Sequence, residues 1–267
     1  MVAAMPRYAM QSMKRTAIRA AREAGKIILE YYAKNVNAHK KGDSYNLVTA
    51  ADIAAEKAII KIIKERYPTH SLLTEESGEE VNSSDYCWII DPLDGTNNFY
   101  HRFPQFCTSI ALYNKEKPLL GIVFDPLKKE MFYAEKGKGA YLNNKRIEVS
   151  STNKLNKSLL ALGFYYERGT LMRKSLSQMK RFFYENVHGI RRTGSAALDL
   201  CYTACGRFDG YWELKLNPWD YGAGSLIVME AGGKITDIQG KKYALMIKNI
   251  VASNGKIHKN MIEVIGK

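Results

Sequence analysis

The sequence predicts a protein of mixed α and β structure, and three of its patterns support this prediction. Between residues 9 and 33, apolar side chains recur at helical spacing, which is typical of an amphipathic helix. Between residues 108 and 135, three apolar runs separated by turn residues indicate a β-meander. From residue 158 onward, strand-like runs alternate with helical segments. A chain of 267 residues can bury a substantial core, as one large domain or two closely packed halves.

The first half is predicted to continue from the helix over 9–33 into a hairpin or extended loop over 39–48. Thr49 can cap a second helix, with Asp52 as the other half of a capping box, and Pro68 stops this helix. The other elements of this half are strands, which we expect at 71–74, 86–90, 108–113, 119–124 and 130–135.

The second half follows a polar stretch over 150–157. Four short runs are predicted to form strands, at 158–163, 188–191, 208–214 and 234–236. Three longer segments are predicted to form helices, at 171–184, 195–206 and 219–231. We therefore expect two halves, residues 1–150 and 151–267, packed as one compact unit.

The composition is typical of a soluble globular protein, with 46% hydrophobic and 25% charged residues. No apolar run approaches the roughly 18 residues that a membrane span needs, and the first 15 residues lack the apolar region of a secretory signal. The four cysteines are interpreted as buried free thiols, because a zinc site from Cys201 and Cys205 would need two more ligands at suitable spacing. These features predict a cytoplasmic location. Four methionines could each be the first residue, namely Met1, Met5, Met10 and Met13.

The net charge of +13 comes from 40 Lys and Arg against 27 Asp and Glu. Such a charge would steer an anionic phosphate substrate toward the protein. The basic residues are spread along the chain in pairs, without the signature of an RNA-binding motif. A solvated surface is therefore the favoured interpretation, and the alternative is a regulatory protein that binds RNA or another protein.

The segment 88–99 is the most informative part of the chain. An apolar run that is predicted to be a strand ends in Asp91 and Asp94, and Gly95-Thr96 follows. Pro92 fixes its own φ and turns the chain, so both carboxylates and the carbonyl of Leu93 can face one point. Carboxylates suit Mg²⁺, and the N–H groups of Gly95 and Thr96 at a helix start suit a phosphate. The alternative is that Asp91 merely ends a strand and Asp94 caps a helix.

Other segments repeat this chemistry in a fixed order. They are Asp52, Glu75-Glu76, Gly194-Ser195-Ala196, Glu213 and Trp219-Asp220. Together with Asp91-Pro92-Leu93-Asp94-Gly95-Thr96, they resemble the inositol monophosphatase family of metal-dependent, lithium-sensitive phosphatases, in its bacterial type. The resemblance extends from about residue 17 to residue 255. It implies an α+β fold, a layered α-β-α-β-α sandwich of the kind shared with fructose-1,6-bisphosphatase, with the active site between the halves.

The resemblance also implies roles for these residues. The matching residues hold Mg²⁺, two or three ions per site, through Asp91, Asp94, Asp220, Glu75 and the carbonyl of Leu93. Several carboxylates around one point repel one another strongly without cations, which is the physical reason to expect metal here. The metal-activated water is oriented and deprotonated by Thr96 and Glu75, with Asp52 supporting Thr96. Glu76 is an outer ligand or an ordinary exposed residue, and Lys41 matches a loop lysine near the metals.

Substrate contacts are expected mostly from the second half. Gly194, Ser195 and Ala196 open a helix whose N–H groups and hydroxyl can meet sugar oxygens. Glu213 is an acid in an apolar strand and would need a partner such as an inositol hydroxyl. Its alternative partner is Arg191 or Arg192 in an ion pair. The family also implies that Asp94 and Asp220 contact the substrate.

The sequence thus predicts a Mg²⁺-dependent phosphoric monoester hydrolase that converts myo-inositol 1-phosphate to myo-inositol and phosphate. A fructose-1,6-bisphosphatase or a dual-specificity sugar phosphatase is the alternative enzyme. The resemblance further implies inhibition by Li⁺ and a homodimer.

Overall fold

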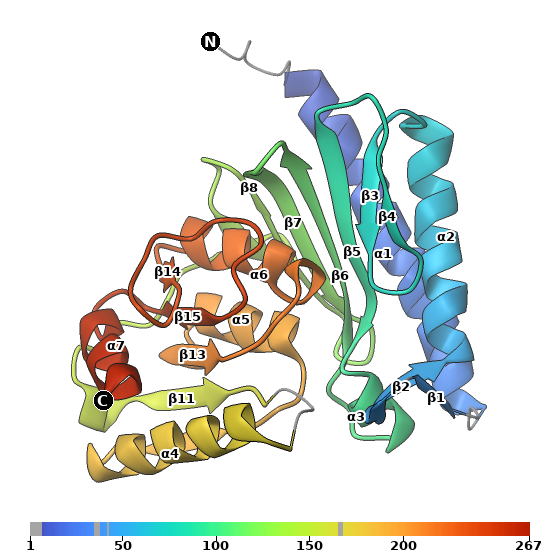
Figure 1. The fold of residues 1–267 in the computed structure, drawn as a ribbon. Helices are drawn as coiled ribbons and strands as arrows, with labels where there is room; N and C mark the ends of the chain where they lie inside the picture. The colour runs from blue at the N-terminus through green and yellow to red at the C-terminus, as the bar shows by residue number, and fades with distance from the viewer. Residues whose placement is uncertain (1–6, 35–37, 42, 165–167) are drawn as a thin grey trace.

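The computed structural model describes residues 7–34, 38–41, 43–164 and 168–267 (Figure 1). The helices are α1 (Arg7–Ala33), α2 (Ala50–Arg66), α3 (Thr96–Tyr100), the 3₁₀ turn η1 (Leu155–Lys157), α4 (Thr170–Tyr184), α5 (Ala196–Ala204), α6 (Pro218–Glu230) and α7 (His258–Gly266). The strands of the first half are β1 (Ala38–Lys41), β2 (Asp43–Thr49), β3 (Ser71–Thr74), β4 (Gly78–Glu80), β5 (Tyr86–Asp94), β6 (Cys107–Asn114), β7 (Lys117–Asp125), β8 (Glu130–Glu135), β9 (Ala140–Leu142) and β10 (Lys145–Ile147). The strands of the second half are β11 (Leu159–Leu162), β12 (Gly189–Arg191), β13 (Gly210–Glu213), β14 (Lys234–Thr236) and β15 (Ile250–Ser253).

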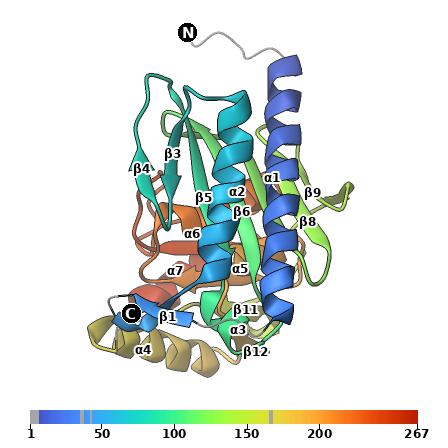
Figure 2. The ribbon, with the colours of Figure 1, turned by 90° about the vertical axis from the view of Figure 1, so that its right-hand side faces the viewer.

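The elements form five layers, so the predicted α-β-α-β-α sandwich is confirmed. Helices α1 and α2 lie side by side across one face of the larger sheet (Figure 2), and their alanines and isoleucines pack on β5, β6 and β7. Helices α5 and α6 fill the space between the two sheets. Helices α4 and α7 cover the outer face of the smaller sheet, where Phe182 contacts Trp212.

The larger sheet has the strand order β10-β9-β8-β7-β6-β5-β3-β4. Its strands are antiparallel except for β3 and β5, which run parallel. The register between β5 and β6 shifts between Asp91 and Asp94, which face Ser109 and Cys107. Three steps on β5 thus correspond to two on β6, so an extra residue is accommodated as a bulge.

The bulge corrects the predicted end of this strand. We expected the strand over 86–90 to stop before the two acids, but β5 continues through Asp94. In a regular strand, residues three apart point to opposite faces. Because the bulge adds one residue, Asp91 and Asp94 can both line the same pocket.

The smaller sheet has the order β12-β11-β13-β15-β14. Strands β11, β12 and β13 are parallel, and β15 pairs in antiparallel fashion with β13 on one side and with β14 on the other. The start of α5, which follows β12, and the start of α6, which follows β13, line the same pocket as the end of β5.

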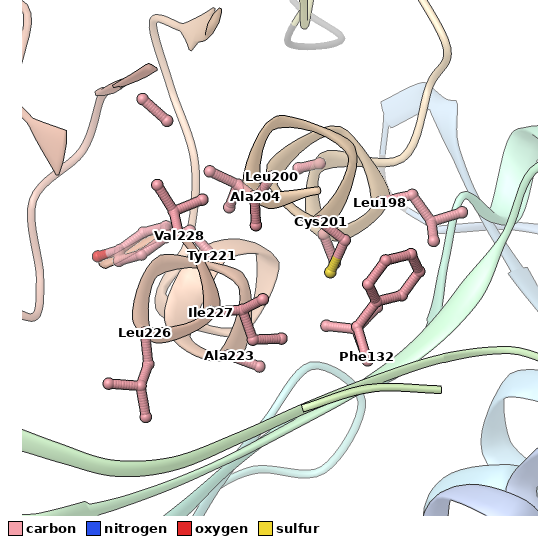
Figure 3. Packing of buried hydrophobic residues seen from close by; sticks show 14 of the residues in the cluster. Phe132, Leu198, Leu200, Cys201, Ala204, Tyr221, Ala223, Leu226, Ile227 and Val228 are labelled. Atoms are coloured by element: carbon pink, nitrogen blue, oxygen red, sulfur yellow. The ribbon is translucent and has the colours of Figure 1, made fainter. Parts of the chain in front are cut away.

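The core between the sheets is built from α5 and α6. Figure 3 shows Leu198 and Cys201 of α5, with Ala223 and Ile227 of α6, on the side facing Phe132 of β8. All five side chains are buried without measurable exposure. Burying such apolar surface favours folding by roughly 25 cal/mol per Å², so this layer fixes the two sheets to each other.

Most predicted elements are confirmed, with shifted ends. Helix α1 begins two residues before the predicted 9–33, and the hairpin, the meander and the helices of the second half are present. Six elements were not predicted from the sequence, namely β4, β9, β10, η1, β15 and α7. The predicted cap at Thr49 involves a side chain outside the described part of the structure. Among the described helices, none is both long enough and apolar enough to cross a membrane.

Candidate active site

A pocket of about 150 Å³ lies where β5, α3, α5 and α6 meet. Eleven of the residues singled out in the sequence line it, namely Glu75, Asp91, Leu93, Asp94, Gly95, Thr96, Gly194, Ser195, Ala196, Glu213 and Asp220. They come from five separate segments of the chain. The fold therefore brings together nearly all of the predicted site residues, while Asp52 lies behind the lining.

The turn after β5 is organised by its own hydrogen bonds. The Asp91 carboxylate accepts from the backbone N–H of Leu93 at 3.0 Å. The Leu93 carbonyl accepts from the Thr96 hydroxyl at 2.9 Å. Asp94 is the last residue of β5 and Gly95, at φ 94°, caps α3, so the alternative that Asp94 caps this helix is wrong.

Asp94 is held by the start of α5. Its Oδ2 accepts from the Ser195 hydroxyl at 2.6 Å and from the N–H of Ala197 at 2.8 Å. Burial raises the pKa of Asp94 to about 6, although these hydrogen bonds oppose the rise. The Ser195 hydroxyl was expected to meet sugar oxygens, but here it donates to Asp94 and also accepts from the N–H of Leu198.

Asp220 occupies the first turn of α6. We expected the helix to start at Trp219, but α6 starts at Pro218 and its cap is Asn217. Asp220 is the third helical residue and forms a capping box, in which its Oδ2 accepts from the N–H of Asn217 at 2.6 Å. Burial and the negative charge of Glu75 raise the pKa of Asp220 well above its ordinary value.

Glu75 links two groups of acids. The carboxylate oxygens of Asp52, Glu75 and Glu76 all lie within 4.8 Å of one another. Asp91, Asp94 and Asp220, which are also described, do not belong to that close group. Yet the charge of Glu75 raises the pKa of Asp91 and of Asp220, in both cases after burial.

The hydroxyl of Thr96 lies between the turn and Asp52. It donates to the Leu93 carbonyl at 2.9 Å, and Oδ2 of Asp52 is 3.4 Å away. A hydroxyl carries one proton, so the shorter bond to Leu93 is the stronger one. Burial raises the pKa of Asp52, and the charges of Glu75, Glu76 and Glu56 add to the rise.

The chemistry of these donors fits Mg²⁺. All of them are oxygens, which hard cations prefer. Within the described residues, no lysine, arginine or histidine forms an ion pair with Asp91, Asp94 or Asp220. Burial raises the pKa of Asp91 and of Asp220, and repulsion from neighbouring acids adds to the rise; a divalent cation would relieve this repulsion.

Glu213 also lines the pocket, as the last residue of β13. Its Oε2 accepts from the Tyr211 hydroxyl at 2.6 Å. Burial raises the pKa of Glu213 to about 7, and the positive charge of Arg192 opposes this rise. Among the described residues neither Arg191 nor Arg192 forms an ion pair with Glu213, so that alternative is wrong.

The sequence analysis missed Asp199, which also lines the pocket. It is buried, and its Oδ1 accepts from the Thr193 hydroxyl at 2.6 Å. Burial raises the pKa of Asp199 well above its ordinary value. Helical spacing could have found this residue, because Asp199 follows Ser195 by four positions and therefore lies on the same helix face.

Two further predictions concern Lys41 and the cysteines. Lys41 is the last residue of β1, but its side chain lies outside the described part of the structure. The four cysteines are free thiols, with Cys107 and Cys201 buried and Cys87 and Cys205 partly buried. Cys205 caps α5 rather than lying within it.

The chain belongs to the inositol monophosphatase family, whose sequence profile matches residues 9–267. It is 44% identical over 256 residues to Nus factor SuhB of Salmonella typhimurium, covering 95% of each chain. It is 42% identical over 258 residues to inositol-1-monophosphatase of a Synechocystis strain, covering 96% of this chain and 89% of the relative. The crystal structure of the extragenic suppressor protein suhB from Bartonella henselae matches with a TM-score of 0.91 at 38% identity, covering 96% of this chain and 99% of that one.

Proposed function

We propose that the protein is a Mg²⁺-dependent phosphomonoesterase that hydrolyses myo-inositol 1-phosphate. The observation that carries this proposal is the pair of acid groups that share Glu75 at one end of a pocket. Family membership supports phosphatase chemistry, and the name of the Synechocystis relative supports the inositol ester. The free thiols support a cytoplasmic location, and the family resemblance supports a homodimer.

The acids would divide the work of holding cations. Asp91, Asp94, Asp220, Glu75 and the carbonyl of Leu93 are the proposed Mg²⁺ ligands. When bound, the cations would polarise the phosphoryl oxygen, lower the pKa of a water molecule and neutralise the leaving oxygen. Because Glu75 neighbours both acid groups, more than one cation fits this arrangement better than a single ion.

Residues of the chain itself would position the phosphate and deprotonate the attacking water. The N–H groups of Gly95 and Thr96 are the proposed phosphate donors. The Thr96 hydroxyl donates its hydrogen bond to the Leu93 carbonyl, so its lone pairs remain to orient the attacking water. Glu75 is the proposed base, with Asp52 behind Thr96.

The polyol would lie between the start of α5 and the end of β13. Glu213 accepts from Tyr211 through one oxygen, and we propose that the carboxylate also accepts from a substrate hydroxyl. The backbone at Gly194 and Ala196 offers further contacts. Asp94 and Asp220 line the same pocket and are proposed to contact the substrate as well.

The test is phosphate release from a panel of esters with Mg²⁺, comparing the wild type with Asp94→Asn. Neutralising this carboxylate should lower turnover of myo-inositol 1-phosphate by more than about 100-fold. Asp209→Asn is the matched control, since Asp209 is also buried and accepts two hydrogen bonds, from Ser150 and Leu159, outside the pocket.

Each outcome is decisive for one part of the proposal. Preference for fructose 1,6-bisphosphate would keep the mechanism and change the substrate. Loss of turnover on adding LiCl would support the proposed sensitivity to Li⁺. No metal-dependent release from any ester would overturn the enzyme proposal.

The second candidate is a regulatory binding function, which the name of the Salmonella relative, a Nus factor, favours. The net charge of +13 is compatible with an RNA partner. Filter binding of RNA across a salt series would distinguish the cases. Steep weakening with salt and no sequence preference would mean bulk charge alone.

A further inference from the structure

Asn98 connects two distant segments although it lies outside the pocket lining. It sits on α3, and its side-chain amide nitrogen donates to the carbonyl of Gln105 at 2.7 Å and to that of Thr193 at 2.8 Å. The second acceptor is 95 residues away in the sequence. Asn98 therefore bonds the turn after β5 to the segment that precedes α5.

The partner segment packs directly on this amide. Gly194 has φ +88°, and a Cβ there would lie 2.9 Å from Nδ2 of Asn98. A side chain at this position would therefore require the Asn98 amide, and the Arg192 guanidinium 2.7 Å away, to shift, and the positive φ itself favours glycine. We call residues 193–196 the recognition loop, since Gly194, Ser195 and Ala196 are the proposed substrate contacts.

The other end of the recognition loop is held by Asp94. Its Oδ2 accepts from the Ser195 hydroxyl and from the N–H of Ala197. Asp94 and Asn98 stand four residues apart, on either side of Gly95 and Thr96. The loop is thus attached at two points to the turn that carries the proposed phosphate donors.

The segment that accepts from Asn98 is itself held in place by Lys128. The Lys128 ammonium donates to the Gln105 side-chain oxygen at 3.1 Å and to the Pro104 carbonyl at 3.0 Å. Lys128 also forms an ion pair with Asp125, which is fully buried. Asn98 bonds the backbone carbonyl of Gln105, the residue whose side chain Lys128 holds, and this bond restrains the amide plane so that the remaining N–H points at Thr193.

We propose that Asn98 is a positioning residue that docks the recognition loop for the polyol part of the substrate. It acts through the Thr193 carbonyl and touches no reacting group. Removing its amide frees the Thr193 end of the loop while the Asp94 end stays attached. Recognition of the polyol is then weakened, whereas hydrolysis of esters that have no polyol is little affected. The kinetic part of this inference rests on the proposed phosphatase function, whereas the docking part does not.

The test compares Asn98→Ala and the isosteric Asn98→Asp with a matched control. In Asn82→Ala the lost amide also donates two hydrogen bonds, to the His70 carbonyl at 3.0 Å and to Glu80 at 2.9 Å, far from the pocket lining. Hydrogen exchange of residues 193–197 is measured first, and both Asn98 variants should exchange faster there than the control. Unchanged exchange would overturn the docking, whatever the activity.

The kinetic comparison uses two esters, myo-inositol 1-phosphate and p-nitrophenyl phosphate. The Asn98 variants should raise KM for the inositol ester by about tenfold, with little change for the aryl ester. An equal loss for both esters would overturn the recognition role, since Asn98 would then serve the acids. A wild type that hydrolyses neither ester would refute the proposed function, and the exchange result alone would then decide the docking.

Discussion

At the scale of single residues, Glu75 has the most consequential position. It neighbours Asp52 and Glu76 on one side, and its charge acts on Asp91 and Asp220 on the other. A single cation needs all of its ligands within reach of one point, but the group formed by Asp52, Glu75 and Glu76 contains only some of the acids. Under the proposed function, this position suits Glu75 to act both as a metal ligand and as the base.

A prediction at this scale concerns Glu213→Gln. The pKa of Glu213 is raised by burial from 4.5 to about 7. In the unfolded chain the group loses its proton at lower pH, so its charge costs stability as pH rises from 4.5 toward 7, and the cost is complete above that. The neutral amide removes this cost, which is worth about 3 kcal/mol. In the presence of a metal chelator, the melting temperature of the variant should be several degrees higher than that of the wild type at pH 8. At pH 4 the two melting temperatures should be equal.

The same substitution should lower turnover of the inositol ester, because a carboxylate acceptor is replaced by a weaker one. Thermal unfolding monitored by circular dichroism gives the stability, and phosphate release gives the activity. A stability gain that is the same at both pH values would show that the buried charge is not its cause.

Residue types predicted the site better than they predicted its hydrogen bonds. All predicted ligands line the pocket. They could be predicted because acids beside Gly and Pro have few structural uses. The sequence did not reveal that Ser195 would be engaged by Asp94, since these residues are 101 positions apart. Asn98 was missed for the same reason, because its partners are set by the packing of the two sheets.

At the scale of elements, the β5 bulge and the turn at Gly95 decide the geometry of the acids. A Cβ at Gly95 would lie 2.8 Å from the carbonyl of Gln105 and 3.2 Å from Cα of Phe106. Both are backbone atoms, which cannot move aside as a flexible side chain can. The turn therefore needs glycine for its positive φ and also for the close approach.

Gly95→Ala should consequently destabilise the protein more than Gly78→Ala. Gly78 has a similar φ of +81°, but nothing lies within 4 Å of the position that a Cβ would take there. The strain of a positive φ alone costs roughly 1–2 kcal/mol, and the clash should add about 2 kcal/mol at Gly95. Urea unfolding of both variants measures the difference. Equal losses would mean that the turn can move away from the backbone of Gln105 and Phe106, and that this contact does not fix its position.

Long periodic elements were predictable, and short ones were not. The 27-residue α1 shows its apolar stripe over seven turns, and the meander has turn residues between its strands. Strand β15 has four buried residues, whose run is too short to show a period. It is fixed by pairing with β13 and β14, which is information that resides in the fold.

At the scale of the whole molecule, the pocket lies where both halves contribute their ends. The larger sheet supplies Asp91 and Asp94 from β5, while the starts of α5 and α6 come from the second half. Asp91 and Asp94 are buried in the packed molecule, and burial is the first cause of the raised pKa of Asp91, of Asp94 and of Asp220.

This burial predicts how Mg²⁺ and pH act together on stability. Burial raises the pKa of Asp94 from 3.8 to about 6, and it also raises the pKa of Asp91 and of Asp220. For acids with a raised pKa, the folded state holds protons that the unfolded state has lost, so stability falls as pH rises from about 4 upward. For Asp94 alone the loss is about 3 kcal/mol.

Bound cations should offset this loss, since they replace the protons at the same oxygens. The difference in melting temperature between Mg²⁺ and chelator should therefore be small at pH 5 and should grow to several degrees at pH 8. The measurement is differential scanning calorimetry at constant ionic strength, with K⁺ replacing Mg²⁺ in the control. Asp94→Asn should reduce the difference at pH 8, because one of the buried charges is gone. A difference that stays constant from pH 5 to pH 8 would show that Mg²⁺ binds elsewhere than at these acids.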